Sequence, residues 1–146
     1  MYARNCKLFL SVTALVEATT GLGLLILPAV LFVVLLGLNP ATADAIFVGR
    51  LAGAALVAIG IASWMARVDE QTPAHRGLLT GILVYNAVAT LLLAYAGAVL
   101  KMNGVLLWPA VGLHAVLAVW CFSCLRPGSI ARVFCGDAVG RRTPKN

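Results

Sequence analysis

Apolar residues run almost without interruption from Leu8 to Leu38, and no charged residue follows Glu17 until Asp44. A run of this length is typical of a helix that crosses a membrane, whose hydrocarbon core is about 30 Å thick. The segment 8–36 is longer than an upright span needs, because a helix rises about 1.5 Å per residue. Since Pro28 lacks a backbone N–H, we predict that this first helix is long and kinked near Pro28.

Three further apolar stretches of membrane-spanning length follow, at about 45–66, 77–100 and 105–124. Thr42 or Asp44 can cap the start of the second span. Thr72 followed by Pro73 indicates an N-cap and a proline at the first helical position before the third span. The short turn between the third and fourth spans predicts that these two helices are antiparallel neighbours.

The pattern therefore predicts an all-α fold, an integral membrane four-helix bundle. Residues 1–128 form a single transmembrane domain in this interpretation, and 129–146 a short basic cytoplasmic tail. The composition agrees, because 62% of the residues are hydrophobic and 11% are charged, whereas soluble domains carry about 25% charged residues. Glycine pairs four residues apart, such as Gly49 and Gly53, favour close packing of helices in a bilayer. We expect the first helix to be retained and not cleaved as a signal peptide.

Basic residues fall mostly on one predicted side of the membrane. Nine of the eleven are on that side: Arg4, Lys7, Arg67, Arg76, Arg126, Arg132, Arg141, Arg142 and Lys145. The positive-inside rule then predicts that both termini and the 67–76 loop are cytoplasmic. The net charge of +6 is attributed to this topology and to contact with anionic lipids, and nucleic acid is not an expected partner. Arginine in excess of lysine, with abundant Ala and Gly, favours a bacterial inner membrane.

A polar centre is predicted where four polar residues fall at similar depth: Glu17, Tyr85, Asn86 and His114. A carboxyl in the middle of a span costs about 2.5–3.5 kcal/mol and normally faces a partner or a water-filled cavity. Thr13 shares the helix face of Glu17. One interpretation is structural, with interhelical hydrogen bonds worth about 0.6–2 kcal/mol each. The other is a site that relays protons or holds the polar head of a lipid-soluble ligand.

Arg50 also lies within a predicted span, about one turn from its start. It can extend its guanidinium to the outer headgroups or pair with a buried acid. Its distance from Glu17 along the membrane normal favours the first alternative.

Cys121 and Cys124 form a Cys-x-x-Cys motif in the last span. With Cys6 and Cys135 they lie on the predicted cytoplasmic side, where thiols stay reduced, so structural disulfides are not expected. Packing as small apolar residues is the favoured role. Redox chemistry at Cys121 and Cys124 is the alternative, and no metal site is predicted, because these cysteines form only a loose set of ligands.

Two family resemblances follow from these residues. Four helices with Cys121-Phe-Ser-Cys124 in the last one resemble the vitamin K epoxide reductases, although the short 37–45 loop lacks the cysteines which that family carries in its first loop. A single Glu17 in the first of four helices is similar to the small multidrug resistance exporters, whose carboxylate exchanges protons for cationic substrates. Those exporters can insert in either orientation, whereas the basic residues here favour one fixed orientation.

These observations favour a multi-pass membrane protein that serves as an accessory or assembly subunit and is not an enzyme. Its expected partners are the lipid bilayer and other membrane subunits or further copies of the chain. A lipid- or quinone-like ligand at the polar centre is part of this hypothesis, and no cofactor is required by the sequence. The alternatives are a small proton-coupled transporter that uses Glu17 and a membrane thiol oxidoreductase that uses Cys121 and Cys124.

Overall fold

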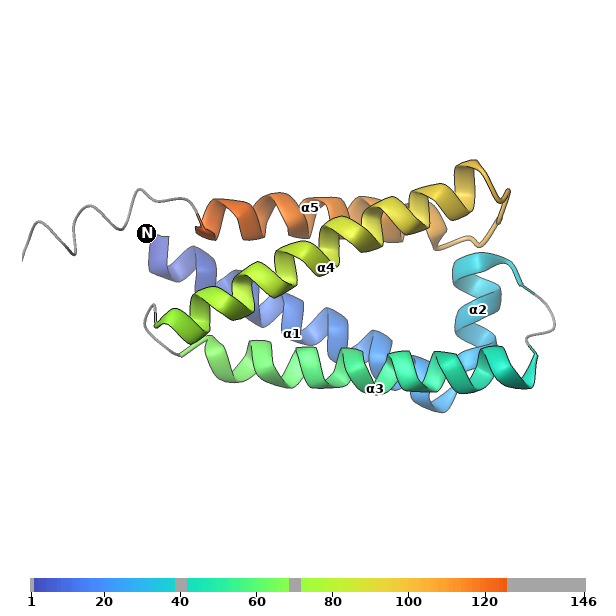
Figure 1. The fold of residues 1–146 in the computed structure, drawn as a ribbon, viewed down its shortest axis with the longest axis horizontal. Helices are drawn as coiled ribbons and strands as arrows, with labels where there is room; N and C mark the ends of the chain where they lie inside the picture. The colour runs from blue at the N-terminus through green and yellow to red at the C-terminus, as the bar shows by residue number, and fades with distance from the viewer. Residues whose placement is uncertain (1, 39–41, 69–71, 126–146) are drawn as a thin grey trace, which may run out of the picture.

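The structure is a computed structural model that describes residues 2–38, 42–68 and 72–125. These residues form five helices (Figure 1): α1 Tyr2–Ile26, α2 Pro28–Leu36, α3 Ala43–Ala66, α4 Pro73–Ala98 and α5 Leu107–Leu125. All except α2 are long and apolar enough to cross a membrane. The prediction of an all-α chain with four membrane-length helices is therefore confirmed, while the predicted tail 129–146 lies outside the described residues.

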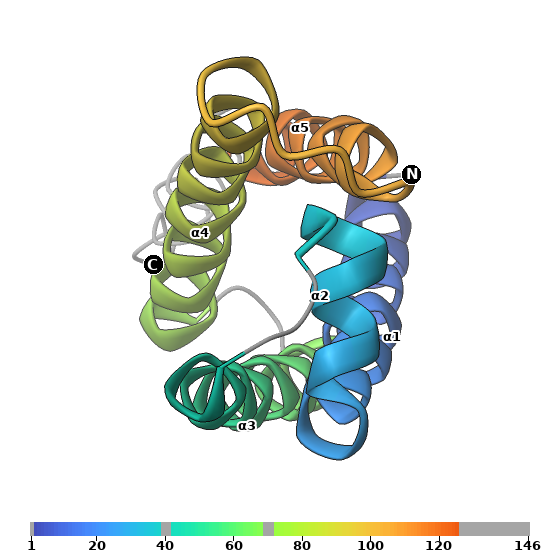
Figure 2. The same cartoon turned by 90° about the vertical axis from the view of Figure 1, so that its right-hand side faces the viewer.

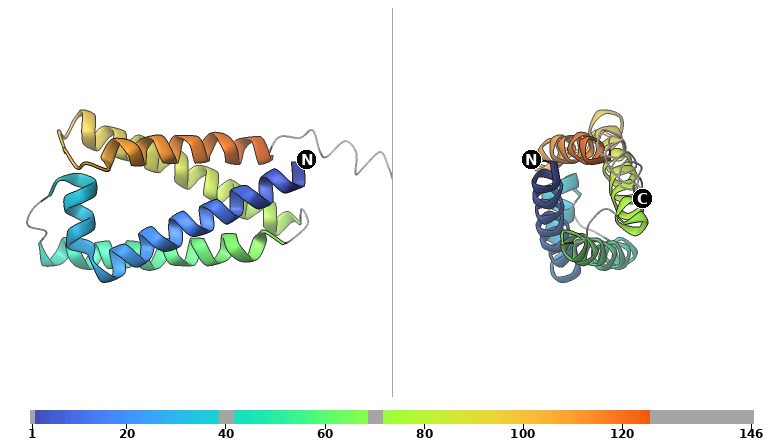
Figure 3. Two further views of the ribbon diagram at one scale, coloured as in Figure 1. Left: turned by 180° about the vertical axis from the view of Figure 1, so that it is seen from behind. Right: turned by 90° about the vertical axis from the view of Figure 1, so that its left-hand side faces the viewer.

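The first apolar segment differs from its prediction, because it forms two helices instead of one kinked helix. Leu27 has a non-helical backbone, with φ −129° and ψ 53°, and Pro28 is the first residue of α2. A proline inside a helix lacks the N–H for the helical hydrogen bond, and its ring clashes with the preceding turn, whereas the first helical position tolerates it. Figure 3 shows that α2 turns across the end of the bundle. It ends at Leu36 and is followed by Gly37, whose φ of 71° is left-handed.

The starts of α3 and α4 follow the capping signals in the sequence. The hydroxyl of Thr42 accepts a hydrogen bond from the backbone N–H of Ala45 at 3.3 Å. The hydroxyl of Thr72 accepts one from His75 at 3.2 Å, and Pro73 is the first residue of α4. Both threonines thus satisfy backbone donors that a helix start otherwise leaves unpaired.

The spanning helices form two closely packed pairs, α1 with α3 and α4 with α5, while contacts between the pairs are sparser. Figure 2 shows the four helices as the sides of a square, seen from the end that α2 covers. Glycines let α1 and α3 approach each other closely: a Cβ added to Gly21 would lie 2.6 Å from the carbonyl oxygen of Gly53. Small residues permit this backbone contact in membranes.

The two ends of the bundle are held together differently. At one end, a disulfide joins Cys6 in α1 to Cys124 in α5, and we call this the disulfide end. A buried apolar core surrounds it, formed by Cys6, Phe9, Leu10, Leu79, Ile82, Leu117, Cys121 and Cys124. At the other end, called the α2 end, the backbone N–H of Leu106 donates to the carbonyl of Val34 at 3.0 Å. There is no room for a side chain at Gly104, whose Cβ would overlap the carbonyl of Leu35.

Candidate functional site

The structure brings the four predicted polar residues together at the middle of the bundle, and we keep the name polar centre for Glu17, Tyr85, Asn86 and His114. Glu17 comes from α1, Tyr85 and Asn86 from α4, and His114 from α5. Glu17 is 1% exposed and Asn86 is 0% exposed, while Tyr85 and His114 are half-buried. The structure thus shows how each helix is rotated about its axis, which the depth of these residues in the predicted spans did not determine. The functional role of these residues stays a prediction.

One hydrogen bond of the polar centre joins the two helix pairs. The hydroxyl of Tyr85 donates to Oε2 of Glu17 at 3.1 Å. The second carboxyl oxygen, Oε1, is buried and has no hydrogen-bond partner in the described part of the chain. Glu17 therefore keeps one free acceptor, or one free hydroxyl when it is protonated, at the middle of the bundle.

A second hydrogen bond lies within the α4–α5 pair. Nδ1 of His114 is 2.9 Å from Oδ1 of Asn86, and the Asn86 amide nitrogen donates to the carbonyl of Ile82 at 2.9 Å. Because the amide oxygen only accepts, Nδ1 of His114 carries the proton in this arrangement. The rings of Tyr85 and His114 meet edge to face, with centroids 5.6 Å apart. Two hydrogen bonds, Tyr85 to Glu17 and His114 to Asn86, are thus linked by a ring contact between Tyr85 and His114.

Helix geometry explains why α4 contributes to both hydrogen bonds. Successive residues of a helix point about 100° apart, since one turn takes about 3.6 residues. Tyr85 therefore faces α1, and the adjacent Asn86 faces α5. Arg50 does not enter the site: it is exposed on α3, and neither Glu17 oxygen bonds to it.

Three more polar side chains are buried near the disulfide end without a hydrogen-bond partner in the described part of the chain. They are Thr13 at Oγ1, Ser63 at Oγ and His75 at Nδ1. Thr13 and Ser63 are 0% exposed and His75 is 8% exposed. The sequence analysis placed Thr13 on the face of Glu17 but missed Ser63 and His75, because a single Ser or His near a span end carries no distinguishing pattern.

His75 borders an open cavity between α3 and α4, with a volume of about 350 Å³. The lining residues are Ala62, Met65, Ala66, Ala74, His75 and Leu78. The imidazole is the polar side chain of this lining, so the cavity offers one hydrogen-bonding group on an otherwise apolar wall. The cavity lies where the two helix pairs contact each other sparsely.

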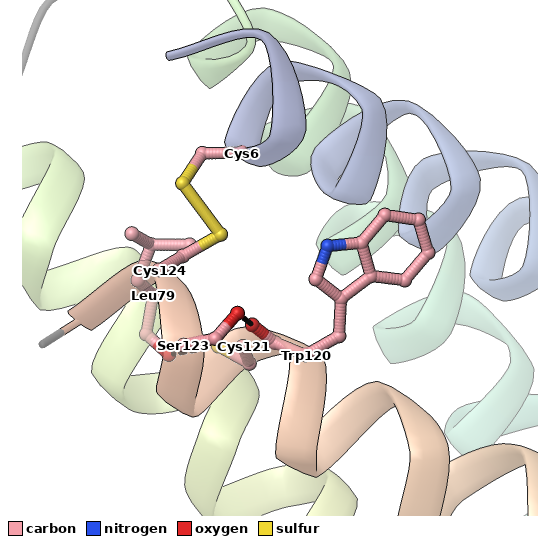
Figure 4. The surroundings of a disulfide bond; sticks show 6 residues. All are labelled: Cys6, Leu79, Trp120, Cys121, Ser123 and Cys124. Carbon is pink, nitrogen blue, oxygen red and sulfur yellow. Dashed lines mark hydrogen bonds between the residues drawn. A yellow bond between two sulfur atoms is a disulfide. The ribbon is translucent and has the colours of Figure 1, made fainter. Parts of the chain in front are cut away.

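The cysteines correct one expectation of the sequence analysis. Cys6 and Cys124 form a disulfide between α1 and α5, with Cα atoms 5.7 Å apart, although structural disulfides were not expected. Cys121 is a free, buried thiol that donates to the carbonyl of Leu79 on α4 at 3.1 Å. Figure 4 shows Cys124 directed at α1 and Cys121 on another face of α5. The two cysteines of the motif, both on α5, thus contact different neighbouring helices, α1 and α4.

No grouping of three or more His, Cys, Asp or Glu that could hold a metal occurs within the described residues, and Cys135 lies outside them. Comparison with protein-family models, curated proteins and solved structures finds no match to the chain. The chemistry of the polar centre itself, a carboxyl with a phenol, an amide and an imidazole, is that of hydrogen bonding and proton transfer.

Proposed function

We propose that this chain is an accessory or assembly subunit of a membrane complex, and that its polar centre holds a proton or the polar head of a lipid-soluble, quinone-like ligand. The observation that carries the proposal is the unpartnered Oε1 of Glu17 beside the hydroxyl of Tyr85. An amide or hydroxyl would join the helices without the insertion cost of a carboxyl. A group that is retained despite this cost, with half of its bonding capacity unused, favours a functional role.

The ligand part of the proposal is tested by the molecules that travel with the purified chain. We expect mass spectrometry of protein extracted in mild detergent to find a lipid-soluble molecule with a carbonyl or hydroxyl head. Glu17→Leu removes both carboxyl oxygens while keeping an apolar volume, so this molecule should be lost. Thr19→Val, at an exposed position of the same helix, should retain it. Identical extracts from all three proteins would contradict the ligand proposal.

The subunit part of the proposal is supported by an outward-facing pair of glycines on α4. A Cβ added to Gly77 or Gly81 would meet nothing within 4 Å, and both residues are exposed. Small residues four positions apart let the backbone of another transmembrane helix approach closely. The occupant that fits this face is therefore a helix of a neighbouring membrane subunit.

Crosslinking in native membranes tests this face. Gly81→Leu should abolish the crosslinked complex without loss of the chain itself, because the leucine blocks close approach and points away from the bundle. Ala54→Leu, which adds a similar volume at an exposed position of α3, should leave the complex intact. Equal crosslinking of both variants would remove the α4 face from the proposal.

We propose that both termini and the disulfide end face the cytoplasm of a bacterial inner membrane, which the excess of basic residues on that side supports. The Cys6–Cys124 disulfide is the observation against this orientation, since the cytoplasm keeps thiols reduced. A single thiol placed at the exposed Thr42 distinguishes this orientation from the reverse one. Impermeant reagent should label Thr42→Cys on intact cells, in a background without native cysteines. Labelling that requires lysis would reverse the orientation.

A second candidate function, the thiol oxidoreductase, is favoured by the disulfide with a free thiol one helical turn away at Cys121. A disulfide beside a thiol is the arrangement that thiol–disulfide exchange requires. If Cys121 only packs beside a structural disulfide, Cys121→Ala should assemble and function normally. Loss of function in Cys121→Ala, with normal protein levels, would support this candidate instead.

A further inference from the structure

We propose that Glu17 exchanges its proton with water from one side of the membrane only, through a path that enters beside His75 and passes Ser63 and Thr13. This inference rests on the proposed proton-holding role of the polar centre and deepens it. The reaction is a simple proton transfer, in which the Glu17 carboxyl gives its proton to a water molecule, leaving a carboxylate and a hydronium ion. The reverse transfer reloads the carboxyl.

The first support is the set of unpartnered buried atoms. A buried polar group without a partner costs about 1–3 kcal/mol, and water is its usual partner in proteins. Thr13, Glu17 and Ser63 are at most 1% exposed and His75 is 8% exposed, yet each has a polar atom without a hydrogen bond within the described residues. All of these atoms lie between the middle of the bundle and the disulfide end.

The packing of α1 against α3 places Ser63 next to Thr13 in depth. A Cβ on Gly60 would lie 3.0 Å from both the carbonyl oxygen of Ala14 and the backbone nitrogen of Ala18, so Gly60 is level with the turn between these two residues. The helices are antiparallel, and Ser63 lies about one turn beyond Gly60 towards the disulfide end. Thr13 lies one turn from Glu17 in the same direction and on the same helix face. Ser63 and Thr13 therefore connect the disulfide end to the carboxyl in steps of about one turn.

The entrance is the cavity between α3 and α4. Its α3 wall includes Ala62 and Ala66, which are one and three residues from Ser63 and lie on the same side of it, and its α4 wall includes His75; Ser63 itself is not part of the lining. Its volume of about 350 Å³ holds several waters, each of which takes about 30 Å³ in the liquid. His75 can pass a proton at this entrance, because an imidazole has two ring nitrogens that can donate or accept hydrogen bonds.

Within residues 2–38, 42–68 and 72–125, the α2 end offers no comparable set of unpartnered polar atoms. There the backbone of α2 contacts the connection between α4 and α5, with the N–H of Leu106 bonded to Val34 and Gly104 packed against Leu35. None of the unpartnered buried side-chain atoms of the described residues lies on that side of Glu17. The path therefore ends at the polar centre, and Glu17 exchanges its proton only with water that enters from the disulfide end.

The groups around Glu17 are a phenol, an imidazole and hydroxyls. Tyr85 of α4 bonds to it, His114 of α5 contacts the Tyr85 ring, and Thr13 is its neighbour on α1. Ser63 is the polar side chain that α3 adds near this level. Glu17 is thus the carboxylic acid of the cluster. The neighbouring hydroxyl and imidazole groups transfer protons to and from it or orient its carboxyl.

Thiol accessibility tests the path in the full-length chain in liposomes. We expect Ser63→Cys and Thr13→Cys to react with the water-soluble reagent 2-aminoethyl methanethiosulfonate added at the disulfide end, with cysteine inside the other compartment as scavenger. Ala14→Cys is the matched control, since it is buried at the same depth but packs against the backbone at Gly60. Peptide mass spectrometry assigns each adduct, so the native cysteines stay in place. The path thiols should react at least tenfold faster than the control.

Ala62→Phe fills the entrance and should slow both path thiols while leaving the control unchanged. Equal rates at Ser63→Cys, Thr13→Cys and Ala14→Cys would overturn the path, as would reaction from the α2 end alone. Failure of the path is distinguishable from failure of the polar-centre function. If the path thiols do not react but Glu17→Leu loses the bound ligand, only the path is wrong. If the path thiols react but Glu17→Leu retains the ligand, only the ligand proposal is wrong.

Discussion

Two glycine pairs with the same spacing have opposite surroundings in this bundle. Gly49 and Gly53 of α3 face other helices: a Cβ on Gly53 would lie 2.7 Å from the carbonyl oxygen of Gly21, and one on Gly49 would lie 2.7 Å from the ring of Phe32. Gly77 and Gly81 of α4 face outwards, with open space at both Cβ positions. The first pair is used within the chain, whereas no described residue packs against the second.

The difference shows that a small-residue motif specifies close approach but not the partner. Both pairs have glycine at i and i+4, and both lie in apolar helices. What separates them is the rotation of each helix, which the polar residues help to fix. Tyr85 and Asn86 turn towards α1 and α5, so the opposite face of α4 is left outside. Substitutions at these glycines should therefore differ in sign as well as in size.

The largest effect is expected for Gly53→Leu. The new side chain would collide with the backbone of α1, which cannot move without separating the α1–α3 pair. Overpacking costs about 1–3 kcal/mol and occasionally more, and a leucine against backbone should exceed this range. Unfolding monitored by circular dichroism in detergent should show loss of the folded bundle. The adjacent Ala54→Leu is exposed and should unfold like the parent; equal damage by both variants would refute the assigned helix rotation.

The sequence predicts the spans and the polar residues well, because both depend on local composition. Long apolar runs define four helices, and Thr42 and Thr72 mark where two of them begin. Glu17 and His114 could be matched in depth by counting residues from the helix ends. Rotation and pairing could not be predicted, since they depend on packing between segments far apart in the chain.

The features that the sequence did not predict also depend on packing between distant segments. The orphaned Ser63 becomes visible only when α1 and α3 are placed together. The Cys6–Cys124 disulfide joins residues 118 positions apart, and compartment chemistry argued against it. The break at Leu27 depends on whether the chain bends at a proline or starts a new helix there, and contacts of α2 with the α4–α5 connection favour the second outcome.

A smaller loss of folding stability is expected for Gly60→Ala. The methyl group would lie 3.0 Å from both the carbonyl oxygen of Ala14 and the backbone nitrogen of Ala18. The two helices must separate slightly, so we expect destabilisation of about 1–2 kcal/mol, within the range for overpacking. Denaturation with increasing detergent strength measures it. A gain in stability would mean that α1 and α3 are farther apart than described.

Gly81→Ala should instead increase the folding stability. Alanine is favoured over glycine by about 0.8–1.0 kcal/mol in a helix interior, and nothing within 4 Å opposes the added methyl group. The isolated chain should therefore become more stable by up to about 1 kcal/mol in the same assay. Gly112→Ala, at an equally open position of α5, provides the matched case. Destabilisation at Gly81 but not at Gly112 would indicate that the α4 face is already occupied in the purified protein.

The smallest net effect is expected for Gly97→Ala, where two contributions oppose each other. The added methyl group would lie 3.0 Å from the Leu107 side chain and 3.1 Å from the ring of Trp108, both on the neighbouring α5. Unlike backbone, these side-chain atoms can shift by a few tenths of an ångström, so the packing cost should nearly cancel the helix-propensity gain of about 0.8–1.0 kcal/mol. We expect a change within about 0.5 kcal/mol, as for ordinary tolerated substitutions. A loss as large as that of Gly60→Ala would show that α4 and α5, too, are held at backbone distance, and the contrast between the two helix pairs would disappear.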